Sequence, residues 1–109
     1  MLKVTIKLYP VEWQAMVKLC PKYDEIAGIP MKELALENLL LAEYRSRITP
    51  AQVLSWQSKF SNRTYCCTLP VSVAQTLWNE MQHAQLDAHE QLLLNKLDQA
   101  LTNFHLPKL

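Results

Sequence analysis

Lys3-Val4-Thr5-Ile6-Lys7-Leu8 is the clearest structural signal in this chain of 109 residues. Every second side chain in it is a large aliphatic one, and those between are lysine or threonine. Successive side chains of a β-strand point to opposite faces, so this two-residue period predicts a strand with one buried and one solvated face. Even a pair of β-strands is only marginally stable by itself in water. This strand therefore needs a partner strand, and it needs helices to cover its apolar face.

Helical patterns follow this strand. Pro10 stands where a helix can begin, and apolar side chains recur at three- and four-residue spacing up to Pro21, which has no amide hydrogen to continue a helix. After a looser segment, residues 30–47 predict a second helix, too apolar to lie exposed. Thr49-Pro50-Ala51-Gln52 is a capping sequence, so residues 50–60 are predicted to form a short connecting helix.

The same order of elements then recurs. Tyr65-Cys66-Cys67-Thr68-Leu69-Pro70 predicts a short strand that ends in proline, and an amphipathic stretch follows it. Asp87 and Glu90 form a capping box before a last helix. In that helix Leu92-Leu93-Leu94-Asn95-Lys96-Leu97 echoes Leu34-Ala35-Leu36-Glu37-Asn38-Leu39. The strand-helix-helix unit therefore occurs twice.

These observations predict one domain over residues 1–109, built from repeats at 2–47 and 63–103 with a linker at 48–62. An all-helical fold stays open as an alternative, because residues 65–69 are short and their alternation is blurred by the two cysteines.

Charge and hydropathy restrict the class of partner. The net charge is +1, and there is no basic tail or polybasic block. Contacts to phosphates must therefore come from a few local side chains and backbone amides, which predicts modest non-specific affinity for nucleic acid. No apolar run reaches the about 18 residues that cross a bilayer, and the start lacks the features of a signal peptide. We expect a cytoplasmic protein with no membrane partner.

Neither catalysis nor metal binding is indicated. The sequence has no glycine-rich phosphate loop or nucleophile elbow, and its three histidines are not spaced one helical turn apart, so we expect no enzyme, no metal and no cofactor. Alternation turns one of Cys66 and Cys67 inward, which favours packing over a redox role. Trp13 and Trp78 lie on predicted core stripes, whereas Trp56 is either a core residue or a stacking platform for single-stranded nucleic acid.

The repeated unit resembles the ribbon-helix-helix family of DNA-binding proteins, of the Arc and MetJ type. The resemblance is carried by the alternating strand and by Pro10, by the turn Gly28-Ile29-Pro30 before Glu33-Leu34, and in the second unit by Leu69-Pro70 and the capped turn at Asp87. It implies a mainly α-helical fold with a short two-stranded antiparallel ribbon, in which residues 3–8 pair with residues 64–69. The chain would be a pseudo-twofold, single-chain version of the usual dimer, as in the tandem members among conjugation accessory proteins.

The resemblance also implies sequence-specific binding of double-stranded DNA by the ribbon in the major groove, as a transcriptional regulator such as a repressor or as a relaxosome accessory factor. The side chains that would contact bases are those facing outward from the two strands, namely Lys3, Thr5, Lys7, Thr64, Cys66 and Thr68. The start of the second helix would bind a phosphate, at Met31 and Lys32. Single-chain units could further assemble on DNA as a homo-oligomer.

The second unit departs from the family's pattern where a phosphate would bind. Asp87 and Glu90 place carboxylates there, and His89 offsets them only in part. Either the two half-sites are contacted unequally, or the second unit is a scaffold and the first contacts the ligand. The alternative function is a protein-binding adaptor or an antitoxin-like module that uses the same scaffold without touching DNA. The near-neutral charge favours this alternative, and the Lys-Thr-Lys face of the first strand favours DNA.

Overall fold

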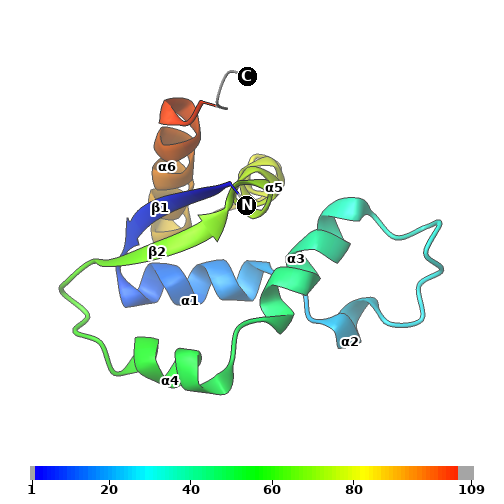
Figure 1. The fold of residues 1–109 in the computed structure, drawn as a ribbon, viewed down its shortest axis with the longest axis horizontal. Helices are drawn as coiled ribbons and strands as arrows, with labels where there is room; N and C mark the ends of the chain where they lie inside the picture. Colours follow the sequence, from blue (N-terminus) through cyan, green and yellow to red (C-terminus); the bar gives the residue numbers. More distant parts are fainter. Residues whose placement is uncertain (1, 106–109) are drawn as a thin grey trace.

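The two alternating segments lie side by side in the computed structural model, which describes residues 2–105. Within that range they form one two-stranded antiparallel sheet, and most of the remaining residues are helical, which confirms this much of the predicted fold class. The elements run in the order β1 (Lys3–Leu8), α1 (Pro10–Leu19), α2 (Tyr23–Ile26), α3 (Leu36–Ser46), α4 (Pro50–Gln57), β2 (Tyr65–Pro70), α5 (Val71–Met81) and α6 (Ala88–Asn103). Figure 1 shows α6 behind the paired strands, α5 at their right-hand end and α1 below them.

The register of the ribbon brings apolar side chains into facing positions. Val4 lies opposite Leu69, and Ile6 lies opposite Cys67. β2 runs from residue 65 to residue 70, one position later than the expected partner at 64–69. The antiparallel pairing itself is confirmed, and the all-helical alternative is wrong. Because the buried positions alternate along both strands, a shift of one residue would move the apolar set into solvent, so burial fixes the register.

The core lies on the inner face of the ribbon and between the helices. Leu8 and Leu69, one from each strand, are fully buried. The buried apolar residues form one cluster, made of Val4, Ile6, Leu8, Trp13, Met16, Val17, Cys20, Leu41, Cys67, Leu69, Val73, Ala74, Leu77, Met81, Leu93 and Leu97. Each large side chain in it contributes about 1.5–3 kcal/mol relative to an exposed position. The ribbon, which is marginal alone, is stabilised by this shared core.

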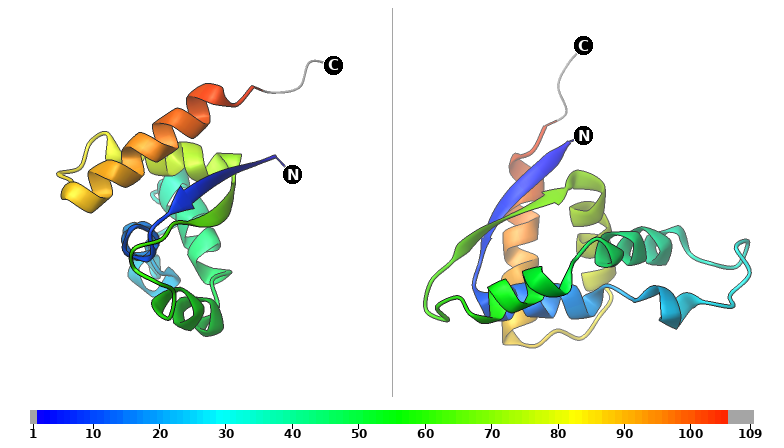
Figure 2. Two further views of the ribbon diagram at one scale, coloured as in Figure 1. Left: turned by 90° about the vertical axis from the view of Figure 1, so that its left-hand side faces the viewer. Right: turned by 60° about the horizontal axis from the view of Figure 1, so that its bottom comes forward.

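Helices from the two halves of the chain pack across one another. α1 packs against α6, and α3 packs against α5. α6 also lies along β1, so the last helix of the chain covers the first strand. A side chain also connects α3 to the end of α1. Nη1 of Arg45 in α3 donates hydrogen bonds to the carbonyl oxygens of Val17 and Cys20. The views in Figure 2 show this crossed arrangement from two further sides.

The second helix of the first half begins later than the sequence predicts. Residues 30–34 form turns, Ala35 is extended, and α3 starts only at Leu36, so the predicted start at residue 30 is wrong. Met31 is 70% exposed and Leu36 is 73% exposed. Short helices depend on tertiary packing for most of their stability, and the exposure of Met31 and Leu36 shows that little within residues 2–105 packs against this segment. The expectation that the whole segment is too apolar to lie exposed is therefore also wrong.

The connecting helix and the last helix begin at the predicted capping sequences. Thr49 and Gln52 exchange side-chain to backbone hydrogen bonds at the start of α4, and Asp87 and Glu90 do the same before α6. α4 ends at residue 57 rather than near residue 60. It is held to the core by Trp56, whose ring stacks on that of the buried Trp13 with centroids 5.0 Å apart and an interplanar angle of 2°. Trp56 is thus a packed side chain rather than a free stacking platform.

Candidate nucleic-acid interface

The outer face of the ribbon gathers the side chains that the sequence singles out. Its exposed members are Lys3, Thr5, Lys7, Cys66 and Thr68, and we call this set the ribbon face. Thr5 and Thr68 lie directly opposite each other, with their hydroxyl oxygens 3.0 Å apart. Lys7 lies opposite Cys66. Thr64, the sixth expected residue, is exposed but precedes β2 by one position. Two segments about 60 residues apart thus contribute to one surface of lysines, hydroxyls and a thiol.

The two strands belong to long stretches of sequence that contain cations but no acidic residue. Residues 1–11 and 44–79 contain no Asp or Glu, although together they make up 47 of the 109 residues. They carry six cationic side chains, which are Lys3, Lys7, Arg45, Arg47, Lys59 and Arg63. All ten acidic side chains belong to the rest of the chain. The net charge of +1 is therefore the sum of two unlike regions.

A group of cations and aromatic rings lies where the linker joins β2, and we call it the linker cluster. Its members are Trp56, Lys59, Phe60, Arg63 and Tyr65. The ammonium of Lys59 lies 4.7 Å from the centroid of the Tyr65 ring and 5.4 Å from that of Trp56. The guanidinium of Arg63 lies 5.1 Å from the centroid of the Phe60 ring. These distances are those of cation–π contacts.

The linker cluster is joined to the ribbon by its own hydrogen bond. The Phe60 amide donates to the Tyr65 hydroxyl at 3.2 Å, and Tyr65 is the first residue of β2. Sequence reasoning did not assign a role to Lys59 or Arg63. The sequence does contain a signal for them, because residues 44–79 include no Asp or Glu. Charge counts over longer segments, which also include the neighbouring acidic residues, do not reveal it.

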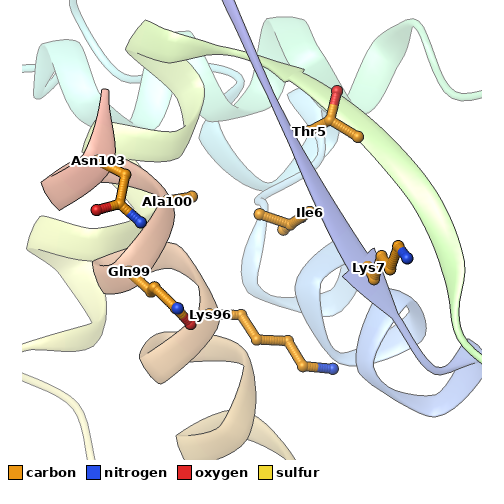
Figure 3. Close-up of a pocket in the computed structure, with 7 residues that line it drawn as sticks. All are labelled: Thr5, Ile6, Lys7, Lys96, Gln99, Ala100 and Asn103. Carbon is orange, nitrogen blue, oxygen red and sulfur yellow. The ribbon is translucent and has the colours of Figure 1, made fainter. Parts of the chain in front are cut away.

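A groove of about 310 Å³ runs between β1 and α6 (Figure 3). One wall consists of Thr5, Ile6 and Lys7, and the other of Lys96, Gln99, Ala100 and Asn103. The charge of Lys96 is compensated, because its ammonium bonds the carboxylate of the fully buried Glu12. Figure 3 shows the Lys7 side chain directed away from α6, so the polar groups that face the groove are the amides of Gln99 and Asn103, which can donate or accept hydrogen bonds.

The positions expected to bind phosphate are not part of this surface. Met31 and Lys32 lie in the turns between α2 and α3, a segment that Figure 1 shows extending away from the ribbon. At the start of α6 the Glu90 amide donates to Asp87 Oδ1 at 2.8 Å, and the Asp87 amide donates to Glu90 Oε1 at 3.2 Å. That helix end already carries two carboxylates, which repel a phosphate.

The cysteines divide into two buried and one exposed, as strand alternation predicts for Cys66 and Cys67. Burial raises the pKa of the Cys20 thiol and that of the Cys67 thiol to about 11. The pKa of the Tyr44 hydroxyl is raised as well, first by burial and then by the two neighbouring thiols. These groups stay neutral at physiological pH and serve as packing. Cys66 is the thiol on the ribbon face.

Over residues 2–105 no three side chains of His, Cys, Asp or Glu come together as a metal site would require. In the same part of the chain, every helix is too short or too polar to cross a bilayer. No protein-family model, no curated protein and no solved structure matches this chain.

Proposed function

We propose that this chain is a single-chain ribbon-helix-helix protein that binds double-stranded DNA in a sequence-specific manner, with its ribbon in the major groove. The observation that carries the proposal is the ribbon face, where Lys3, Thr5 and Lys7 of one strand meet Thr68 of the other on a paired, twofold-like surface. A two-stranded ribbon fits the width of the major groove. Lysine donates to guanine, and threonine contacts either base type or the thymine methyl.

The packing of the helices supports the tandem form of the proposal. The helix after each strand packs against the last helix of the other half, α1 against α6 and α5 against α3. This exchange is what two interlocked strand-helix-helix units require. The charge distribution agrees with it, because the strands and the linker carry cations without acids. In the cell, such a protein acts in the cytoplasm as a transcriptional regulator or as an accessory factor in DNA processing.

The proposal is tested by fluorescence anisotropy with a labelled duplex of mixed sequence at two salt concentrations about fourfold apart. We expect affinity to fall steeply with salt, with a slope of about −0.9 per phosphate neutralised. Lys3→Glu/Lys7→Glu should abolish binding, because it reverses both charges on the ribbon face. Lys18→Glu/Lys22→Glu is the matched control, since both lysines are exposed and lie outside the two strands. A ribbon variant that binds as well as the control would exclude the ribbon mechanism.

One observation favours the second candidate, a protein-binding adaptor or antitoxin-like module. The segment from α2 to the start of α3 exposes several large apolar side chains, namely Tyr23, Ile29, Met31 and Leu36. Acidic residues lie between them at positions 24, 25 and 33, and a fourth follows at position 37. Contiguous exposed apolar surface is typical of protein interaction sites. If the wild-type chain binds no duplex even at low salt, this segment becomes the surface to study.

A further inference from the structure

In protein–DNA complexes, contacts to the phosphates fix the register and orientation of the protein on the duplex, whereas contacts to the bases provide specificity. A ribbon in the major groove therefore needs phosphate contacts as well as base contacts. The two helix starts contribute little here. The turns before α3 extend away from the ribbon, and the start of α6 is occupied by its own carboxylates. The outer face of the ribbon carries two lysines and no other cation. A further source of positive charge close to the ribbon is required.

The linker cluster meets this requirement by its position. It is continuous with the ribbon, since Tyr65 is both a ring of the cluster and the first residue of β2, opposite Leu8. Figure 1 shows the loop from α4 to β2 projecting beyond this end of the paired strands. Because Tyr65 is paired with the fully buried Leu8, its ring lies on the core side of the ribbon. The cluster therefore flanks the end of the ribbon, next to its outer face rather than on it.

The charges of the linker cluster are available to a ligand. Among residues 2–105 the one ion pair joins Lys96 to Glu12, so within that range Lys59 and Arg63 face rings and no carboxylate. The rings also restrict both side chains to few conformations. Less side-chain entropy is then lost on binding than for freely moving lysines.

The linker cluster occurs at one end of the ribbon. At the other end β2 runs directly into α5, and the Val71 amide donates to the Leu2 carbonyl at 3.0 Å, which closes that end without a loop. The two strand-helix-helix units are joined by one linker, at one end of the ribbon. The two ends of the ribbon therefore differ, and its approximate twofold symmetry is broken.

Building on the proposed function, we propose that the linker cluster binds the phosphate backbone of duplex DNA on one side of the ribbon's site, through Lys59 and Arg63. The protein consequently binds its site in one orientation, with contacts that extend further on the linker side. Lys59 and Arg63 contribute affinity that does not depend on sequence, whereas the ribbon face provides the choice of sequence.

The decisive variant is Lys59→Gln/Arg63→Gln, which removes both charges and keeps polar side chains of similar length. We expect the slope of log affinity against log salt to fall by about one unit for each cation removed. Affinity for a selected site and for a mixed-sequence duplex should weaken by the same factor, which leaves the specificity ratio unchanged. Lys59→Arg should retain wild-type binding. Circular dichroism establishes that each variant is folded.

Orientation is read by hydroxyl-radical footprinting on a site selected from a random duplex pool. We expect protection that extends further on one side of the selected sequence, and contraction on that side alone in the double variant. Lys18→Gln/Lys22→Gln is the control with the same charge change, and its footprint should match the wild type.

The outcomes separate this inference from the proposed function. Wild-type binding with an unchanged slope and footprint in the double variant overturns the role of the linker cluster and leaves the ribbon mechanism standing. No duplex binding by the wild type overturns both. Preference for a single strand over the duplex, lost in Phe60→Ala, would show that the exposed Phe60 ring stacks on bases and would also overturn the phosphate role.

Discussion

Glu12 links the start of α1 to α6 through one carboxylate. Its Oε1 accepts from the Tyr9 amide at 2.8 Å and from the ammonium of Lys96, and the side chain is fully buried. Its other oxygen, Oε2, has no hydrogen-bond partner among the described residues. The start of α1 and the middle of α6 are thus connected by a buried charge whose only compensating charge, within residues 2–105, is Lys96.

Replacing Lys96 with methionine should therefore destabilise the protein strongly. Removing one partner of a buried pair leaves an uncompensated charge, which costs about 3–5 kcal/mol. Urea unfolding followed by circular dichroism measures the loss. Lys22→Met, at an exposed lysine, is the control and should cost far less. The double variant Glu12→Leu/Lys96→Met should recover most of the stability, and a single variant no worse than the control would contradict this role for Glu12.

The three thiols should differ in how fast they react with a thiol reagent. Burial holds the pKa of Cys20 and that of Cys67 at about 11, so both stay protonated and unreactive at pH 8. Cys66 is exposed. We expect a chromogenic disulfide reagent at pH 8 to label one thiol per folded chain and three in denaturant. Bound duplex should slow labelling of Cys66, and equally fast labelling in saturated complex would place DNA away from the ribbon face.

The connecting helix α4 depends on one aromatic contact for its position. Trp56 stacks on Trp13 and contributes about 0.5–1.5 kcal/mol beyond the area it buries. Trp56→Ala should release α4, so amide hydrogens of residues 50–57 should exchange faster while those of β1 and β2 keep their protection. Hydrogen exchange read by mass spectrometry distinguishes the two regions. Uniformly faster exchange would mean that this stack stabilises the whole fold rather than one helix.

The strands and the capped helix starts could be predicted because their signals are local. The two-residue period of β1 and the capping boxes at Thr49 and Asp87 each depend on residues a few positions apart. The start of α3 could not be predicted, because it depends on whether anything packs against Met31 and Leu36. Helical periodicity says which side chains share a face, but not whether a neighbouring element covers that face.

The candidate site could be predicted in part for the same reason. Alternation places Lys3, Thr5 and Lys7 on one face, and the facing Thr68 follows once the strands pair. The linker cluster is different, because it depends on the way the loop before β2 folds back to bring Lys59 and Tyr65 together. Its rings and cations lie within ten residues of one another in the sequence, yet no local period marks them.

The molecule as a whole should unfold independently of its concentration. Both strands of the ribbon belong to one chain, so no association step precedes folding. We expect the same thermal midpoint over a hundredfold range of protein concentration, measured by circular dichroism. Cutting the chain within the linker, as co-expressed residues 1–60 and 61–109, should make the midpoint concentration-dependent. A midpoint of the intact chain that rises with concentration would indicate that the folded state requires a second copy.

The hydrogen bond between Thr5 and Thr68 has a consequence for the centre of the ribbon. The two hydroxyl oxygens are 3.0 Å apart, and either can be the donor. One proton is used between them, so the pair retains a single proton to offer outward while both oxygens still accept. Rotation of the two O–H bonds exchanges the roles without moving a heavy atom. The ribbon can therefore present its one central donor from either strand. In the proposed complex with DNA, this would let a purine–pyrimidine step and its reverse be contacted there equally well.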